Sequence, residues 1–251
     1  MYKIITHTIK EEHFDHPMAL EAINGTKISG MYMNNNGVVP DNSVVKETVN
    51  MCVPGMVSVF NTNPAVKFRM ENRTIWARYL WRLRSYIVSA LDGAEDMAVV
   101  EEQLFQNIDE IGDSIRPYYG LVASKKLSQL MRSMVLTELD IVQALKKSEP
   151  IDALQKKFTE QVVEFAKFLE EVNPNHWPAA AVEKTFGRAV TNWIEQARAR
   201  ISKNWPTDIE AVDTAHRIIL AGQDDGTPAF SDIFAMGIIM QFPDRFTEVL
   251  E

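Results

Sequence analysis

Hydrophobic residues recur every three or four positions along most of the chain after Glu71, whereas the preceding segment is broken into shorter pieces. Such a period is typical of amphipathic helices. The pattern predicts helices over residues 73–91, 97–116, 122–147, 150–173, 178–203, 206–220 and 229–241. The second helix should end at Pro117, because proline disfavours helical geometry in the residue before it. We therefore predict a mainly α fold, an up-down helical bundle over residues 71–251.

Residues 1–70 are punctuated by glycine, asparagine and proline, which favour turns. Three β-leaning pieces, at 2–9, 26–33 and 56–60, lie between these turn formers. The segment therefore predicts an N-terminal arm of short strands and loops, without enough apolar mass for a core of its own. The backbone edges of such strands need partners, either on the bundle or on another subunit. The candidate contact residues of the arm are Ile4, Ile5, Ile28, Met31, Val57 and Val59.

The stretch WARYLWRLRSYIV (76–88) combines aromatic residues with arginines, which raises the question of nucleic-acid binding. On a helix, Trp76, Leu83 and Ile87 share one face and most of the arginines lie on another. Base stacking would need exposed aromatics, whereas a bundle helix buries them. The net charge of −8 argues against a general nucleic-acid binder, so we predict burial. Under the alternative, the phosphate contacts would come from Arg73, Arg78 and Arg82.

Several short motifs resemble those of an uncharacterised family of bacterial four-helix-bundle proteins, whose members are sometimes labelled automatically as acetylglutamate kinases. IWARYLWRLRSYIVSAL (75–91) is similar to one helix of that family, and IRPYYG (115–120) to one of its junctions. VNPNHW (172–177) looks like the family's Asn-Pro joint, and DIFAMGIIMQFPDRF (232–246) is similar to its closing helix. The resemblance covers roughly residues 70–246 and implies a fold rather than an activity.

The departures from that family concern the residue types that a metal site would use. The family carries glutamate and histidine on inward faces, where this chain has Ala77 and Tyr79 in one helix and Ser133 and Met134 in another. Arg188 stands near a further expected histidine, whereas Asp232 is retained. The resemblance therefore implies that a metal site of the family, if it has one, is lost here.

Some polar residues nevertheless fall inside the apolar stripes of the predicted helices. Glu138 and Gln161 are examples, and such residues more often fix helix register than catalyse. Asp213 and His216, with Glu138 and Asp232, could line one interior, although the Glu-x-x-His pairs of di-iron bundles are missing. An interior polar pocket is the alternative to a purely apolar core. Its candidate residues are Tyr79, Arg84, Glu138, Arg188, His216 and Asp232.

Other sites of chemistry find little support. HTIKEEHFDH (7–16) could hold a divalent ion through His7, His13, Asp15 and His16, but an exposed polar segment is favoured. The single cysteine, Cys52, excludes an internal disulfide and has no flanking base, which favours a buried thiol. The chain has no GxxxxGK[ST], GxGxxG or GxSxG motif. We therefore expect no enzymatic activity and no cofactor.

No apolar run reaches the roughly 20 residues that cross a membrane, and the charged N-terminus does not resemble a signal peptide. We expect a soluble protein of the cytoplasm, or of a large particle assembled there, and not a secreted one. The leading hypothesis is a structural or assembly protein, whose arm contacts other subunits of a homo- or hetero-oligomer. A virus particle is one such setting. Neither nucleic acid nor a membrane is an expected partner, and the alternative function is a ligand- or metal-binding bundle.

Overall fold

The computed structural model describes residues 18–21, 27–31, 63–222 and 226–247. The chain divides into two compact units, residues 1–57 and 58–251. In the first unit, β1 (Met18–Glu21) and β2 (Lys27–Met31) pair antiparallel, with Leu20 opposite Ile28 and an irregularity between Met18 and Leu20. The predicted strands at 2–9 and 56–60 lie outside the described residues, so the arm as a whole stays a prediction.

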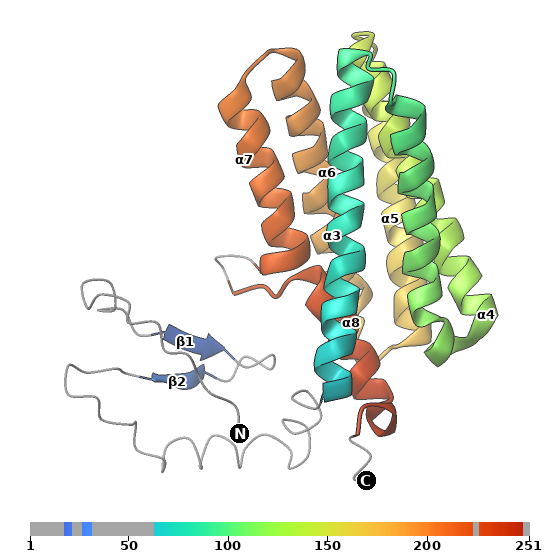
Figure 1. Cartoon of the computed structure of the whole chain (residues 1–251), viewed down its shortest axis with the longest axis vertical. Helices are drawn as coiled ribbons and strands as arrows, with labels where there is room; N and C mark the ends of the chain where they lie inside the picture. The colour runs from blue at the N-terminus through green and yellow to red at the C-terminus, as the bar shows by residue number, and fades with distance from the viewer. Residues whose placement is uncertain (1–17, 22–26, 32–62, 223–225, 248–251) are drawn as a thin grey trace. The chain divides into compact units, whose positions relative to one another are not determined.

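The second unit is a helical bundle, which confirms the predicted helical character. Long helices lie side by side and alternate in direction, and the short helix α8 lies at the end where α3 begins (Figure 1). No described helix is long and apolar enough to cross a membrane. The helical elements are α3 (Asn63–Asp92), α4 (Met97–Lys146), α5 (Asp152–Val172), α6 (Ala179–Ile201), α7 (Trp205–His216), the π-helical turn η2 (Arg217–Ala221), α8 (Phe230–Gln241) and the 3₁₀ turn η3 (Pro243–Arg245).

Helix α4 is a hairpin of two antiparallel helical arms rather than one straight rod. The arms meet at Gly120, whose φ of 80° lies in the left-handed region that glycine adopts without strain. The expected end at Pro117 is therefore wrong by three residues, since that proline lies inside the helix. The two arms approach closely at Gly112, where an added Cβ would lie 2.8 Å from the carbonyl oxygen of Ser124.

Aromatic side chains from three helices meet in the core around Trp76, which is fully buried. Its ring makes edge contacts with Phe186 of α6 and with Phe230 and Phe234 of α8, at centroid distances of 6.3, 4.9 and 5.7 Å. The indole nitrogen donates a hydrogen bond of 3.1 Å to the side chain of Asn72. Phe165 and Trp193 are buried as well. The predicted burial is confirmed for Trp76, Tyr79 and Tyr86 of the 76–88 stretch, whereas it is wrong for Trp81, which is exposed.

Helix α3 begins at Asn63, ten residues before the expected start at position 73, so it crosses the predicted boundary between arm and bundle. The extra turns are held by packing, because Ala65 is buried and Phe68 contacts two aromatic rings. The centroid of Phe68 lies 5.4 Å from that of Tyr118 and 5.2 Å from that of Phe246. Both partners are distant in sequence, so local periodicity did not reveal this start.

Three of the motifs that carry the family resemblance meet at the end of the bundle where α8 lies. The side-chain amide of Asn173 donates to the carbonyl oxygen of Gly237 at 2.9 Å and to the hydroxyl of Tyr119 at 3.2 Å. Trp177 donates to the carbonyl oxygen of Ile233 and stacks on Phe234. These bonds close the end of the bundle, because they satisfy buried polar groups between α4, α5 and α8.

Gly112→Ala should lower the free energy of unfolding by about 2 kcal/mol, because the new methyl group would overlap the carbonyl oxygen of Ser124 and the side chain of Ser128 in the facing arm. The matched control is Gly187→Ala, where no atom of the residues that the structure describes lies within 4 Å of an added Cβ. That change should stabilise α6 by about 0.5–1 kcal/mol through helix propensity. Urea unfolding of both variants at low protein concentration measures the two effects. Equal effects of the two substitutions would contradict the close approach at Gly112.

Candidate functional site

The most deeply buried ionisable pair joins α3 to the second arm of α4. The hydroxyl of Tyr79 donates to the carboxyl group of Glu138, with oxygen–oxygen distances of 3.1 and 3.3 Å. Burial raises the pKa of Glu138 to about 8, although the hydrogen bond from Tyr79 opposes the shift. Burial and the neighbouring carboxylate raise the pKa of Tyr79 well above its ordinary value. The carboxyl group is therefore held largely protonated at neutral pH.

The space beside Glu138 is too small for a ligand. A cavity there has a volume of about 10 Å³ and is lined mainly by apolar side chains, among them Leu83, Ile87 and Trp193. A cavity needs at least about 10–15 Å³ to admit one water molecule. The Tyr79–Glu138 pair thus fills its own space and acts as a polar contact between helices.

Arg84, another residue of the predicted pocket, belongs to a separate ion network between α3, α6 and α7. Its guanidinium pairs with both carboxylate oxygens of Asp208, whose side chain is 2% exposed. Arg200 bridges Asp208 at 3.2 Å and Asp92 at 2.8 Å. The guanidinium of Arg200 also lies 5.6 Å from the centre of the Trp205 ring. This network ties α7 to the rest of the bundle.

The remaining residues of the predicted pocket lie elsewhere. Asp232, in the first turn of α8, accepts hydrogen bonds from Arg73 and lies 3.6 Å from Arg69. Arg188 and His216 are exposed on α6 and α7. The structure therefore brings together Tyr79 and Glu138 of the six predicted residues and does not assemble the other four around them. The expectation failed because periodicity gives the face of each helix but not the heights at which residues of different helices meet.

The described residues contain no group of three or more histidine, cysteine, aspartate or glutamate side chains that could hold a metal ion. Glu138 and Asp232 have the separate partners given above, and His216 is exposed, so the interior set considered from the sequence does not converge. The second metal candidate and the single cysteine lie outside the described residues. They comprise His7, His13, Asp15, His16 and Cys52.

The arginines considered for nucleic-acid contact already have partners within the bundle. Arg73 binds Asp232, Arg78 lies 2.7 Å from the carboxylate of Glu110, and Arg82 donates to the backbone and side chain of Gln103. A phosphate would have to compete with these contacts, which weakens the nucleic-acid alternative.

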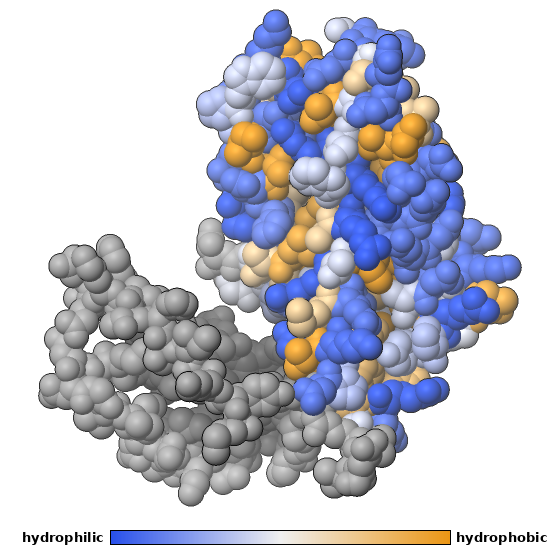
Figure 2. Space-filling model, viewed as in Figure 1, coloured by the Kyte–Doolittle hydropathy of each residue, from blue (hydrophilic) through white to orange (hydrophobic). Residues whose placement is uncertain are grey.

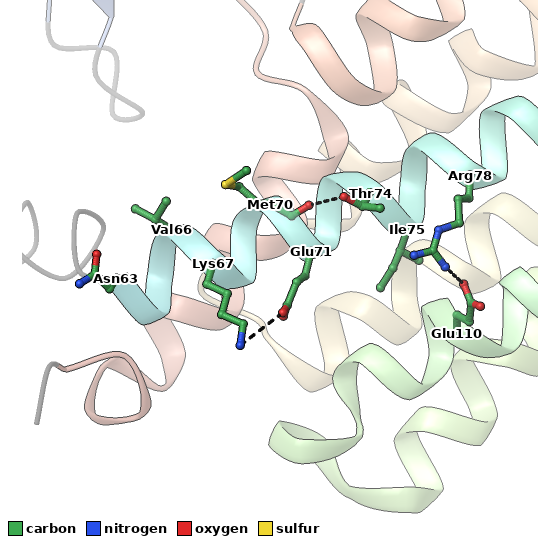
Figure 3. A pocket seen from close by; sticks show the side chains of 9 residues that line it. All are labelled: Asn63, Val66, Lys67, Met70, Glu71, Thr74, Ile75, Arg78 and Glu110. Atoms are coloured by element: carbon green, nitrogen blue, oxygen red, sulfur yellow. Dashed lines mark hydrogen bonds and ion pairs between the residues drawn. The ribbon is translucent and has the colours of Figure 1, made fainter. Parts of the chain in front are cut away.

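The outward side of α3 carries an exposed apolar face, defined here as Val66, Met70 and Trp81, which are 40%, 65% and 73% exposed. Figure 2 shows apolar side chains interspersed among polar ones along this side of the bundle. An open hollow follows the first half of the helix, with Val66 and Met70 beside Thr74 and Ile75 (Figure 3). Burial was predicted for the aromatic residues of the 76–88 stretch together, and Trp81 departs from that prediction because a rotation of about 140° on the helix separates it from the buried Trp76.

Of the six candidate contact residues of the arm, Ile28 and Met31 fall in β2, whose backbone is paired with β1. Ile4, Ile5, Val57 and Val59 lie outside the described residues. The role of all six residues in contacts between subunits therefore stays a prediction.

Asp208 and Arg200, the centre of the ion network, are not among the site residues predicted from the sequence. Asp208 follows Pro206 and Thr207 at the start of α7, where an acidic residue is ordinarily taken as a complement to the helix dipole. The signal available in the sequence was therefore consistent with an exposed residue rather than a buried one.

Comparison of the chain with protein-family models, curated proteins and solved structures found no match. The resemblance of residues 70–246 to the bacterial bundle family consequently remains a prediction.

Asp208→Ala should lower the free energy of unfolding by about 3 kcal/mol, because it leaves the Arg84 and Arg200 guanidiniums without their shared buried carboxylate. Asp213→Ala on the same helix is the control, since Asp213 is exposed and should change stability by less than about 0.5 kcal/mol. Thermal and urea unfolding measure both variants. A loss for Asp208→Ala no greater than that of the control would show that the network contributes nothing to stability.

The stability of the bundle should fall as the pH rises from 4.5, the ordinary pKa of a glutamate, to the folded value of about 8 for Glu138. In this window the folded state binds a proton that the unfolded state has released, so raising the pH favours unfolding. Glu138→Gln removes the titration. Urea unfolding at pH 5, 7 and 9 should therefore show the variant gaining stability relative to the native chain as the pH increases. A constant difference between the two proteins would contradict the raised pKa.

Proposed function

We propose that this protein is a non-enzymatic assembly component, a helical scaffold whose N-terminal arm contacts other subunits. The observation that supports the proposal best is the contrast between the inside and the outside of the bundle. In the described residues, the interior polar groups discussed above are used in contacts between helices. The apolar face of α3, in contrast, is turned to the outside.

The composition of that face is suited to protein contact. Tryptophan and methionine are enriched in protein–protein interfaces, and tryptophan is frequent among the residues that contribute most binding energy. Removing apolar surface from water contributes about 25 cal/mol of favourable free energy per Å². Trp81 and Met70 are the most exposed members, and they lie eleven residues apart, about three turns of helix, on the same side of α3.

The arm supplies the second part of the proposal. It precedes α3 directly in sequence, and it includes the apolar segment MVSVF (56–60). Segments of this kind commonly add to a partner through backbone hydrogen bonds and alternate side chains. We propose that the arm of one subunit reaches the apolar α3 face of another, as in a shell or another large particle.

The alternative, a ligand- or metal-binding bundle, has weaker support. It would require the six predicted polar residues to share one cavity. Tyr79 and Glu138 contact each other, but Arg84 and Asp232 have other partners, and Arg188 and His216 are exposed. Metal analysis of the purified protein tests this alternative independently. A stoichiometric metal ion that is lost on Asp232→Ala would favour it over the scaffold.

The double substitution Met70→Glu with Trp81→Glu should dissociate the assembly, because two charges would have to be desolvated at the contact. Sedimentation velocity of the full chain measures the mass over a range of concentrations. The control is Val122→Glu, at a residue of α4 that is 84% exposed and outside the α3 face. The control should keep the native mass. A native chain that is monomeric at every concentration tested would sink the proposal for self-assembly.

A further inference from the structure

A second surface, distinct from the α3 face, lies between α5 and α6. A groove of about 580 Å³ runs along these two helices. The buried side chains Phe158, Val162 and Ile194 line it together with the exposed residues Thr159 and Thr191. On α6 the lining extends from position 180 to position 198, which corresponds to about 27 Å of helix. The groove is therefore long enough to receive several turns of another helix.

Gly187 lies on this groove near the middle of α6 and is exposed. A glycine inside a helix costs about 1 kcal/mol relative to alanine, so it usually has a packing reason. No atom of the described residues lies within 4 Å of the position that a Cβ would take. Contacts with the described part of the subunit therefore do not account for the glycine, whereas the close approach of a helix from another molecule would.

Charged residues at the edge of the groove are arranged so that they complement their own copy. Lys184 and Glu195 are exposed, and neither has an ion pair with another described residue. They are eleven residues apart, about three turns, and so lie on the same side of α6. If a second α6 packs antiparallel about a two-fold axis near Val190, Lys184 of each copy faces Glu195 of the other. Glu183 and Arg198 are brought opposite each other by the same operation.

We infer that two copies of the chain associate through the α5–α6 groove, with their α6 helices antiparallel and crossing near Val190, within one turn of Gly187. A two-fold contact uses the same surface on both subunits and so must be self-complementary in shape and charge. The groove meets the first requirement through its open glycine and the second through Lys184 and Glu195. This contact does not depend on the N-terminal arm, so it can stand or fall separately from the arm-mediated assembly.

A charge exchange tests the contact in the full chain. Lys184→Glu and Glu195→Lys should each weaken dimerisation at least about tenfold, because each places like charges opposite one another twice per dimer. The combined variant, with both changes, should restore the native dissociation constant. Sedimentation equilibrium gives the constants, and circular dichroism checks that the variants remain folded. Single variants that dimerise as well as the native chain, or a double variant that is not rescued, would overturn the inference.

Cross-linking distinguishes this surface from the α3 face. Thr191→Cys, in a Cys52→Ser background, places a thiol close to the proposed two-fold axis. Mild oxidation should yield a covalent dimer, whereas Val122→Cys in the same background should not. If the chain assembles solely through the arm and α3, neither variant will form the dimer and the charge variants will keep the native mass. That outcome overturns the α6 contact and leaves the arm proposal intact.

Discussion

Burial of the Trp76 ring is the interaction on which the rest of the bundle depends. Its edge contacts join α3 to α6 and α8, since Phe186 and Phe230 each follow Trp76 by more than a hundred residues in the sequence. A large aromatic side chain buries 150–250 Å² and prefers edge-to-face neighbours, so it fixes both the spacing and the rotation of the helices around it. Phe230 and Phe234 occupy one side of this cluster, and the short α8 therefore completes the core although it contributes few turns.

The polar groups of the interior follow from that arrangement. Helices packed around one aromatic cluster bring certain polar side chains inside, and each then needs a partner. Glu138 meets the hydroxyl of Tyr79, and the carboxylate of Asp208 meets two guanidiniums. The two buried carboxyl groups are stabilised differently, because burial favours the neutral form of Glu138, whereas Asp208 pairs with two positively charged guanidiniums. Both use contacts between helices, which gives them a role in fixing register rather than in binding a ligand.

The sequence was sufficient to predict the bundle, because a period of 3.6 residues over long segments leaves few other folds. It was also sufficient to predict that Glu138 is buried, since that residue lies between Met134 and Ile141 in the apolar stripe of its helix. It failed at the six-residue pocket. Whether Arg84 reaches Glu138 or Asp208 depends on where α7 stands against α3, and this is set by packing between distant segments rather than by local pattern.

The two tryptophans of α3 show what the hydrophobic pattern of the sequence does not reveal. Trp76 and Trp81 are five residues apart, and a rotation of about 140° separates their directions on the helix. One anchors the core and the other is 73% exposed, although composition treats them alike. Gly187 is the reverse case, because it is a small residue although no atom of the described part of the chain lies within 4 Å of the place that a Cβ would take. Both residues lie on the outside of the bundle, where the proposed contacts with other copies of the chain would form.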